Sequence, residues 1–204
     1  MHDRKSKKPD FQCLADAASQ YSGYFTNADA EHCGFSRALL EHHDNTGRFV
    51  RILRGVYRFR ESPASPREDV IGPWLAVGRD VAVVSHETAL DLHDLSDVIP
   101  SRVHLTLPRS RRYLRAPSGV TIHTTTRALE PADVTVRDGI RLTAATQTIL
   151  DAADAGVGPE QIELAVRQSL ERGMTTAMRL RENAGGRSAR VRTLIDRAIH
   201  LAGR

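Results

Sequence analysis

Basic side chains gather in one short stretch of this 204-residue sequence. Five arginines fall within thirteen residues, and no acidic residue interrupts them: Arg48, Arg51, Arg54, Arg58 and Arg60. Guanidinium groups at this density bind phosphate oxygens, and such binding weakens as salt rises because it depends on counterion release. Apolar and polar residues alternate on both sides of Gly55, which predicts a β-hairpin with its arginines opposite the apolar face. We assign phosphate contacts to Arg48, Arg51, Arg54 and Arg58.

Side chains that could read base edges lie just before this hairpin. Ser36 is a candidate N-cap of a helix over 36–45, and Leu40 is expected to face the core. The outward residues, with Ser36, form the candidate base-reading set: Arg37, Ala38, Glu41, His42 and Asn45. Arginine pairs with guanine and asparagine with adenine, so Arg37 and Asn45 are the expected specificity residues. Glu41 and Asp44 repel phosphate. They leave open the alternative that this domain binds only protein and not DNA.

These residues are positioned by a predicted series of three helices and a hairpin. A helix runs from Pro9–Asp10 to about Gln20, and a short extended piece follows at 23–25. Thr26 caps a brief helix, with Asp29 in the position of a capping box, and Gly34 ends it. The helix over 36–45 ends before Gly47, and the hairpin follows it. This order predicts a winged helix-turn-helix domain over residues 10–61, whose second helix enters the major groove.

The rest of the chain predicts a different module over residues 67–204. Residues 61–66 have the composition of a linker, and a helix carrying Trp74 and Leu75 follows. Four or five short strands are expected between residues 81 and 142, and Ser85 is expected to cap a helix. Helices over 146–153, 159–172 and 190–201 make the last third helical. The predicted fold is α+β: an N-terminal winged helix, then a mixed α/β domain with a helical tail over 159–204.

A second basic cluster follows the strand that ends at Pro108. It contains Arg109, Arg111, Arg112 and Arg115, with Tyr113 among them. Three interpretations stay open: a solvated loop, a second nucleic-acid contact, or a patch for a protein partner.

Histidines and acidic residues provide a possible metal or catalytic site, but without a recognised spacing. His86 and His93 lie seven residues apart and could share a helix face, and His104 or His123 could join them around a metal. No HExxH, CxxC or phosphate-loop motif occurs. A common class of nuclease active site combines acidic residues with a lysine, and residues 63–204 contain no lysine. Ser85, His86 and Asp91 could be drawn as a catalytic triad, but their closeness in sequence is no evidence of the geometry that a triad requires. We therefore expect no catalytic residue, no metal and no cofactor, with a nuclease as the remaining enzymatic alternative.

Composition and charge are those of a soluble globular protein with a mild basic excess. The net charge is +4, with 40% apolar and 26% charged residues, which permits nucleic-acid binding without requiring it. Cys13 and Cys33 are too few for a disulfide scaffold, so we expect two reduced, half-buried thiols. We expect neither a signal peptide nor a membrane-spanning segment, and hence a cytoplasmic protein.

Six motifs resemble, in order, those of AbiEi-type antitoxins, a winged helix family of toxin–antitoxin systems. They are Gly23-Tyr-Phe-Thr, Phe35-Ser-Arg, Gly55-Val-Tyr-Arg, Ser85-His-Glu-Thr-Ala-Leu, Val103-His-Leu-Thr-Leu-Pro and Leu142-Thr with Ile149-Leu-Asp. The resemblance covers residues 10–153. It departs from the family pattern at His43, where leucine is common, and in a recognition helix poor in arginine.

The resemblance implies a bacterial repressor of its own operon that also acts as an antitoxin. Its partners would be double-stranded operator DNA and a nucleotidyltransferase-like toxin, which antitoxins of this mode need not bind stably. A module that neutralises the toxin without specific DNA binding is the main alternative. The sequence does not choose between a dimer and two monomers on DNA.

Overall fold

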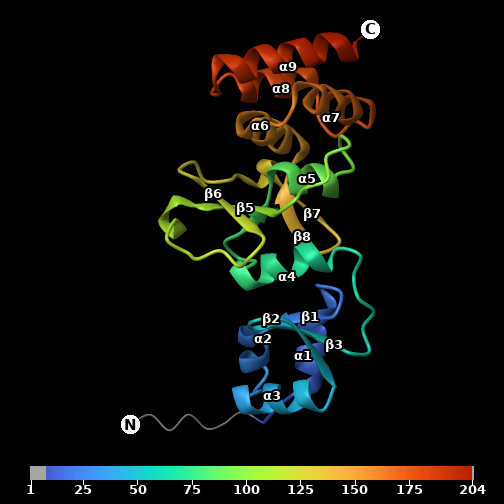
Figure 1. Cartoon of the computed structure of the whole chain (residues 1–204), viewed down its shortest axis with the longest axis vertical. Coiled ribbons are helices and arrows are strands. Elements are labelled where there is room, and N and C mark those ends of the chain that lie inside the picture. The colour runs from blue at the N-terminus through green and yellow to red at the C-terminus, as the bar shows by residue number, and fades with distance from the viewer. Residues whose placement is uncertain (1–7, 204) are drawn as a thin grey trace. The chain divides into compact units, whose positions relative to one another are not determined.

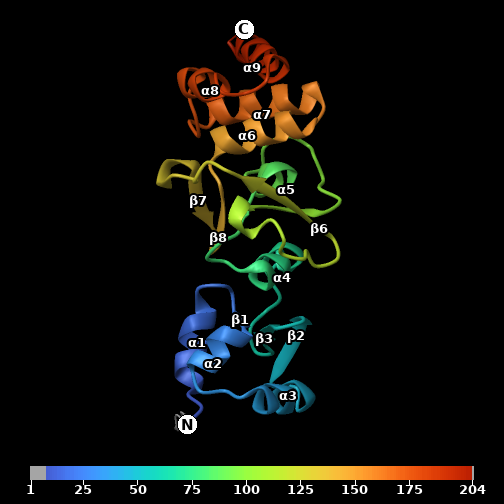
Figure 2. The ribbon, with the colours of Figure 1, turned by 90° about the vertical axis from the view of Figure 1, so that its left-hand side faces the viewer.

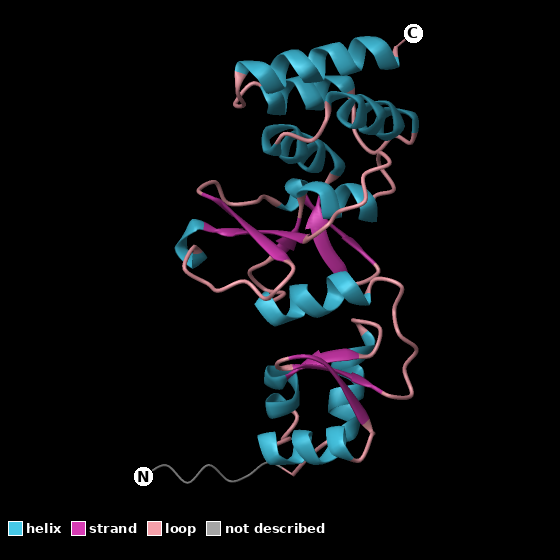
Figure 3. Cartoon of the chain, viewed as in Figure 1, coloured by secondary structure: helices cyan, strands magenta, loops and turns pink. Residues whose placement is uncertain are grey.

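The computed structural model describes residues 8–203, which form two compact units. Of the described residues, the first unit contains 8–79 and 138–140, and the second contains 80–137 and 141–203. Figure 1 labels the helices and all strands except β4, and Figure 3 distinguishes helix from strand. The helix α4 (Glu68–Val77) belongs to the first unit, whereas the domain boundary expected from the sequence precedes it, at residues 61–67.

Three helices of the first unit begin and end where the sequence predicted. In α1 (Phe11–Ser19), the Asp10 carboxylate accepts from the Cys13 amide. In α2 (Asn27–His32), Thr26 and Asp29 form the complete capping box. In α3 (Arg37–Asn45), Ser36 Oγ accepts from the Leu39 amide. Each cap satisfies an amide that the helix itself leaves unpaired, which fixes where these short helices start.

A three-stranded antiparallel sheet completes the winged helix, in the order β1-β3-β2. The predicted hairpin is β2 (Phe49–Leu53) and β3 (Val56–Phe59), and it turns through Gly55, whose φ is +82°. The extended piece at 23–25 is β1 (Tyr24–Thr26), which pairs with β3. One face of the sheet supplies Phe25, Phe49 and Tyr57 to a core shared with α1, α2 and α3. The other face meets α4, where Tyr24 Oη donates to Glu68.

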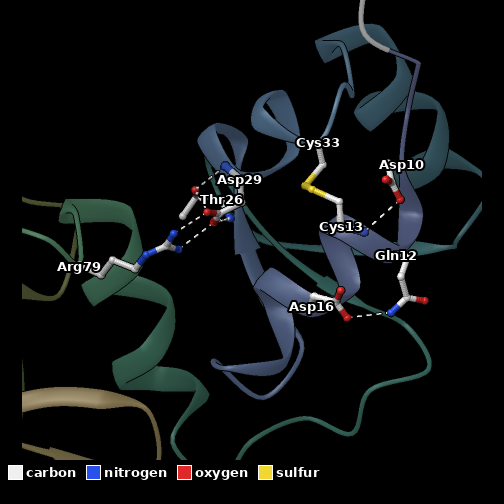
Figure 4. The surroundings of a disulfide bond; sticks show 8 residues. All are labelled: Asp10, Gln12, Cys13, Asp16, Thr26, Asp29, Cys33 and Arg79. Carbon is white, nitrogen blue, oxygen red and sulfur yellow. Dashed lines mark hydrogen bonds and ion pairs between the residues drawn. A yellow bond between two sulfur atoms is a disulfide. The ribbon is translucent and has the colours of Figure 1, made fainter.

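Cys13 and Cys33 form a disulfide, so the expectation of two reduced thiols is wrong. Their Cα atoms are 5.7 Å apart, within the ordinary range for such a bond. The bond joins α1 to the residue that ends α2 (Figure 4). Cysteine spacing alone gave no signal of this, because the two thiols meet only through the packing of the helices.

A second link in the first unit is an ion pair between Arg79 and Asp29. Arg79 donates to both carboxylate oxygens, at 2.8 and 2.5 Å (Figure 4). Burial acts to raise the pKa of Asp29, but the hydrogen bonds from Arg79 and Thr26 outweigh it and hold that pKa below its ordinary value. The capping carboxylate of α2 is therefore also the partner of the arginine that follows α4.

The second unit is built on a five-stranded mixed sheet, in the order β6-β5-β4-β8-β7. Its strands are β4 (Val83–Val84), β5 (Val103–Pro108), β6 (Val120–Thr125), β7 (Val134–Arg137) and β8 (Ile140–Thr143). β5 runs antiparallel to β4 and parallel to β6. Short 3₁₀ turns, η1 (Arg109–Arg111) and η2 (Pro131–Asp133), lie in the connecting loops.

Helices form the rest of the second unit, in agreement with the predicted helical tail. They are α5 (His86–Leu92), α6 (Ala145–Ala155), α7 (Pro159–Glu171), α8 (Ala177–Ala184) and α9 (Ala189–Ala202). Figures 1 and 2 both show α6 between the sheet and the layer of α7, α8 and α9. Ile149, Val166, Leu180 and Ile195 share one core. The α+β fold class is thus confirmed, although the sequence did not reveal α8. Among the described residues, no helix is long and apolar enough to cross a membrane.

Candidate nucleic-acid interface

The exposed face of α3 carries the candidate base-reading side chains. Leu40 is buried, with 2% of its surface exposed, and this burial turns the opposite side of the helix to solvent. The exposed residues on α3 and at its cap are Ser36, Arg37, Ala38, Glu41, His42 and Asn45. The structure therefore leaves every predicted base-reading residue accessible. The free amides of the first turn lie at the same end as Arg37, where they favour an anion.

A groove of about 280 Å³ separates α3 from the hairpin. The α3 wall contains Arg37, Glu41 and Asp44, and the hairpin wall contains Arg51 and Arg54. Arg51 is on the same face of the sheet as Tyr57, because these two residues are directly opposite in the β2–β3 register. The structure thus brings Arg37, Arg51 and Arg54 together and places two carboxylates among them, but Arg51 lies on the face that carries the core residue Tyr57, not opposite the apolar face as predicted.

The other hairpin arginines make contacts within the first unit. Arg58 faces α4: its guanidinium donates to the Ser62 carbonyl and its Nε lies 3.5 Å from Glu68. Arg60 donates to the Gly47 carbonyl at the end of α3. Arg48 is exposed, but its guanidinium stacks 3.9 Å from the centroid of the Phe11 ring. The alternation of polar and apolar residues in the hairpin did not separate these arginines from Arg51 and Arg54. It assumes that one face of the sheet is solvated, whereas α4 covers one face of this sheet and the helical core covers the other.

His43, the position that departs from the family pattern, points inward. Its ring lies 5.1 Å from Phe49, 5.3 Å from Phe11 and 6.1 Å from Phe35, measured between ring centroids. Burial, followed by the charges of His42 and Arg48, lowers its pKa below the ordinary value. The imidazole therefore occupies the place of an apolar side chain and stays neutral near pH 7.

The second basic cluster lies in the exposed loop between β5 and β6. Arg109, Arg111, Arg112 and Arg115 are all exposed. The Arg112 guanidinium stacks on Tyr113, 4.3 Å from the ring centroid, and also donates to its hydroxyl. A cation held flat on an exposed aromatic ring presents a planar surface, and Arg109, at the start of the loop, lines a cavity of about 540 Å³ together with Arg127 and Arg141.

Three histidines of the second unit meet in space, and His93, which the sequence grouped with His86, is not among them, because its Nε2 is hydrogen-bonded to the Thr143 carbonyl. They come from the start of α5, from β5 and from β6: His86, His104 and His123. The Nδ1 of His104 is 3.0 Å from Nε2 of His123, and the rings of His86 and His123 stack at 3.5 Å. Burial, then the charges of the neighbouring rings, lowers the pKa of His86 to about 3 and that of His123 to about 4. All three imidazoles are neutral at pH 7, since burial also lowers the pKa of His104.

Ser85, expected to cap α5, instead belongs to this cluster. It stands at the N-cap position but makes no capping hydrogen bond. Its Oγ accepts from Thr106 Oγ1 and lies 2.8 Å from His86 Nδ1. Ser85 is completely buried, so the Ser85–His86 pair does not expose a nucleophile to a substrate.

A comparison with known proteins finds a family that the winged helix resembles. Residues 13–60 match the model of a family described as a transcriptional regulator, AbiEi antitoxin. The resemblance to AbiEi-type antitoxins is thus confirmed over this segment. The match ends with the hairpin and includes α3 and the arginines of the groove.

A fold relative extends beyond the AbiEi-matching segment. The chain is similar to the crystal structure of the RV2827C protein from Mycobacterium tuberculosis, with a TM-score of 0.61 and 16% identity over 97% of this chain and 79% of that one. At this identity the likeness concerns the fold alone. No protein with a curated description matches the chain.

Proposed function

We propose that this protein is a non-enzymatic, DNA-binding repressor of its own operon and the antitoxin of a toxin–antitoxin pair. The observation that carries the proposal is the groove between α3 and the hairpin, where Arg37, Arg51 and Arg54 converge beside an exposed helix face. In this family context, α3 would enter the major groove of operator DNA. RNA polymerase would be excluded by occupancy.

Each side chain has a proposed role set by its position. Arg37, in the first turn of α3, and Asn45, in its last, would contact base edges together with Ser36 and His42. Arg51 and Arg54 would bind phosphates, with Arg48 beside α1 as a further phosphate contact. Arg58 is left out of the proposed interface because its guanidinium is bound to Ser62 and close to Glu68.

The test is a titration of the full chain against the DNA upstream of its gene, at several salt concentrations. Arg51→Ala with Arg54→Ala should weaken binding and make the salt dependence shallower by about two units of log–log slope, one for each lost phosphate contact. Arg167→Ala with Arg179→Ala is the matched control, because both arginines are exposed on helices of the second unit. Equal loss in both pairs would mean that net charge alone governs binding, and would remove the groove from the interface.

A protein-binding role is the second candidate, and Glu41 and Asp44 favour it. Both line the groove, and carboxylates there repel DNA while they could pair with basic side chains of a toxin. Glu41→Gln distinguishes the two roles. It should strengthen DNA binding if α3 approaches phosphates, and should weaken capture of the nucleotidyltransferase-like toxin if the groove binds that protein instead.

A further inference from the structure

We propose that His86, His104 and His123 form a binding site for a divalent transition-metal ion of the Zn²⁺ class. Among the residues that the structure describes, they are the one group of three or more His, Cys, Asp or Glu residues whose possible ligand atoms all lie within 4.8 Å of one another. This site lies in the second unit and does not depend on the proposed DNA binding. The sequence-based expectation was that no metal binds. The sequence could not show that these three residues meet, because they lie on separate elements.

The topology of the sheet brings the ligands together. β5 and β6 are parallel, with His104 opposite Thr121 and Thr106 opposite His123. His104 and His123 are therefore diagonal neighbours on the same face of the sheet, since side chains two residues apart project to the same side. The Thr88 hydroxyl of α5 accepts from the His104 amide, which holds the start of that helix over the two rings.

The distances between the rings fit one ion with modest adjustment. With Zn–N bonds of about 2.0–2.1 Å at tetrahedral angles, two ligand nitrogens lie roughly 3.3 Å apart. His104 Nδ1 and His123 Nε2 are already 3.0 Å apart. The His86 ring is stacked on His123, so it must turn out of this stack to direct a nitrogen at the same ion. His86 and His123 both line a cavity of about 800 Å³, which gives the ring space to turn.

The surroundings of His86 resemble the support that metal ligands receive in other proteins. When His86 Nδ1–H donates to Ser85 Oγ, Nε2 keeps its lone pair for the ion, and a hydrogen bond of this kind fixes the ring orientation. His86 also has a φ of +54°, although it is not glycine. Backbone held in this region is strained and tends to occur where function requires a particular side-chain direction.

The ligand set selects the class of metal. Three imidazoles without a carboxylate suit zinc and its neighbours, whereas magnesium and calcium require oxygen ligands. Three protein ligands also leave a fourth position open. Here that position would face the cavity, whose walls include Thr124, Gln147 and Arg187. Water or a small anion could therefore complete the coordination.

The experiment uses the full chain without an affinity tag, freed of metal by a chelator and then titrated with Zn²⁺ against a chromogenic competitor. We expect one ion per chain. His86→Gln and His123→Gln should each weaken binding by at least tenfold, and His200→Gln, an exposed histidine of α9, should leave it unchanged. Uptake that is absent, or that survives replacement of all three ligands, would overturn the site.

A second measurement keeps the proposal testable even if a variant fails to fold. Imidazole nitrogen resonances of the unaltered protein should shift on addition of Zn²⁺ for His86, His104 and His123. Those of His42 and His93 should stay in place. Shifts confined to other histidines, or no saturable shift, would show that the three rings are only packed against one another.

Discussion

At the scale of single residues, His43 shows how one side chain links stability to pH. It packs among Phe11, Phe35 and Phe49, and its pKa is lowered mainly by burial. The unfolded chain, with a pKa of about 6.5, takes up a proton before the folded chain does as pH falls. The stability from neutral His43 is therefore complete above that value and is lost as pH decreases through the folded pKa.

We expect His43→Leu to remove this pH dependence from the winged helix. The variant should match or exceed the unaltered protein in unfolding free energy at pH 7, and its advantage should grow between pH 6.5 and 5. Urea unfolding followed by tryptophan fluorescence measures this, because the single tryptophan, Trp74, is buried in the first unit. His200→Leu, at an exposed position of α9, is the control. Parallel pH profiles for His43→Leu and the unaltered protein would contradict the proposed cause.

Single residues also mark where sequence was informative and where it was not. Ser36, Thr26 and Gly55 were predicted correctly, since caps and turns are decided by residues within a few positions of one another. The partners of Arg58 and His86 could not be predicted in this way. Arg58 meets Ser62 and Glu68, which lie outside the hairpin, and His86 meets rings from β5 and β6. The alternation of one strand does not record whether its polar face is covered.

At the scale of elements, the disulfide determines how firmly α1 and α2 are joined. Cys13 and Cys33 are 20 residues apart, and closing a loop of this length raises the free energy of the unfolded state by about 3 kcal/mol, because it removes chain entropy from that state. We expect Cys13→Ser with Cys33→Ser to lower the unfolding free energy of the first unit by about this amount, as measured by urea unfolding under non-reducing conditions.

A reductant supplies the control for this prediction. It should destabilise the unaltered protein to a similar extent and leave the double serine variant unchanged. Thiol titration of the unfolded, unreduced protein should find no free cysteine. Two reactive thiols in that assay would mean that the bond is absent from the protein as purified.

Elements also explain which parts of the fold escaped prediction. β1 was predicted as an extended piece, but its pairing with β3 joins segments about thirty residues apart, so no local pattern predicts that pairing. α8 lies between Gly173 and Gly185 in a polar stretch, whereas the longer α7 and α9 repeat apolar residues at helical spacing. The parallel pairing of β5 with β6, which unites His104 and His123, is likewise non-local.

At the scale of the whole molecule, the two units contain separate hydrophobic clusters. One includes Leu14, Phe25 and Phe49, and the other includes Ile149, Val166 and Ile195. Each unit therefore buries its own apolar surface, which is the main source of folding free energy. Two cores of this kind predict two unfolding transitions instead of one.

These transitions can be separated by the probes and ligands that each unit provides. Trp74 fluorescence should follow the first unit alone, whereas far-ultraviolet circular dichroism weights the helices of the second. Zn²⁺ should raise the midpoint of the second transition, because an ion that binds only the folded state stabilises it. Reduction of the disulfide should lower the midpoint of the first. If both probes report one coincident transition that moves with either treatment, the units fold cooperatively, and an ion bound at His86, His104 and His123 would then stabilise the winged helix as well.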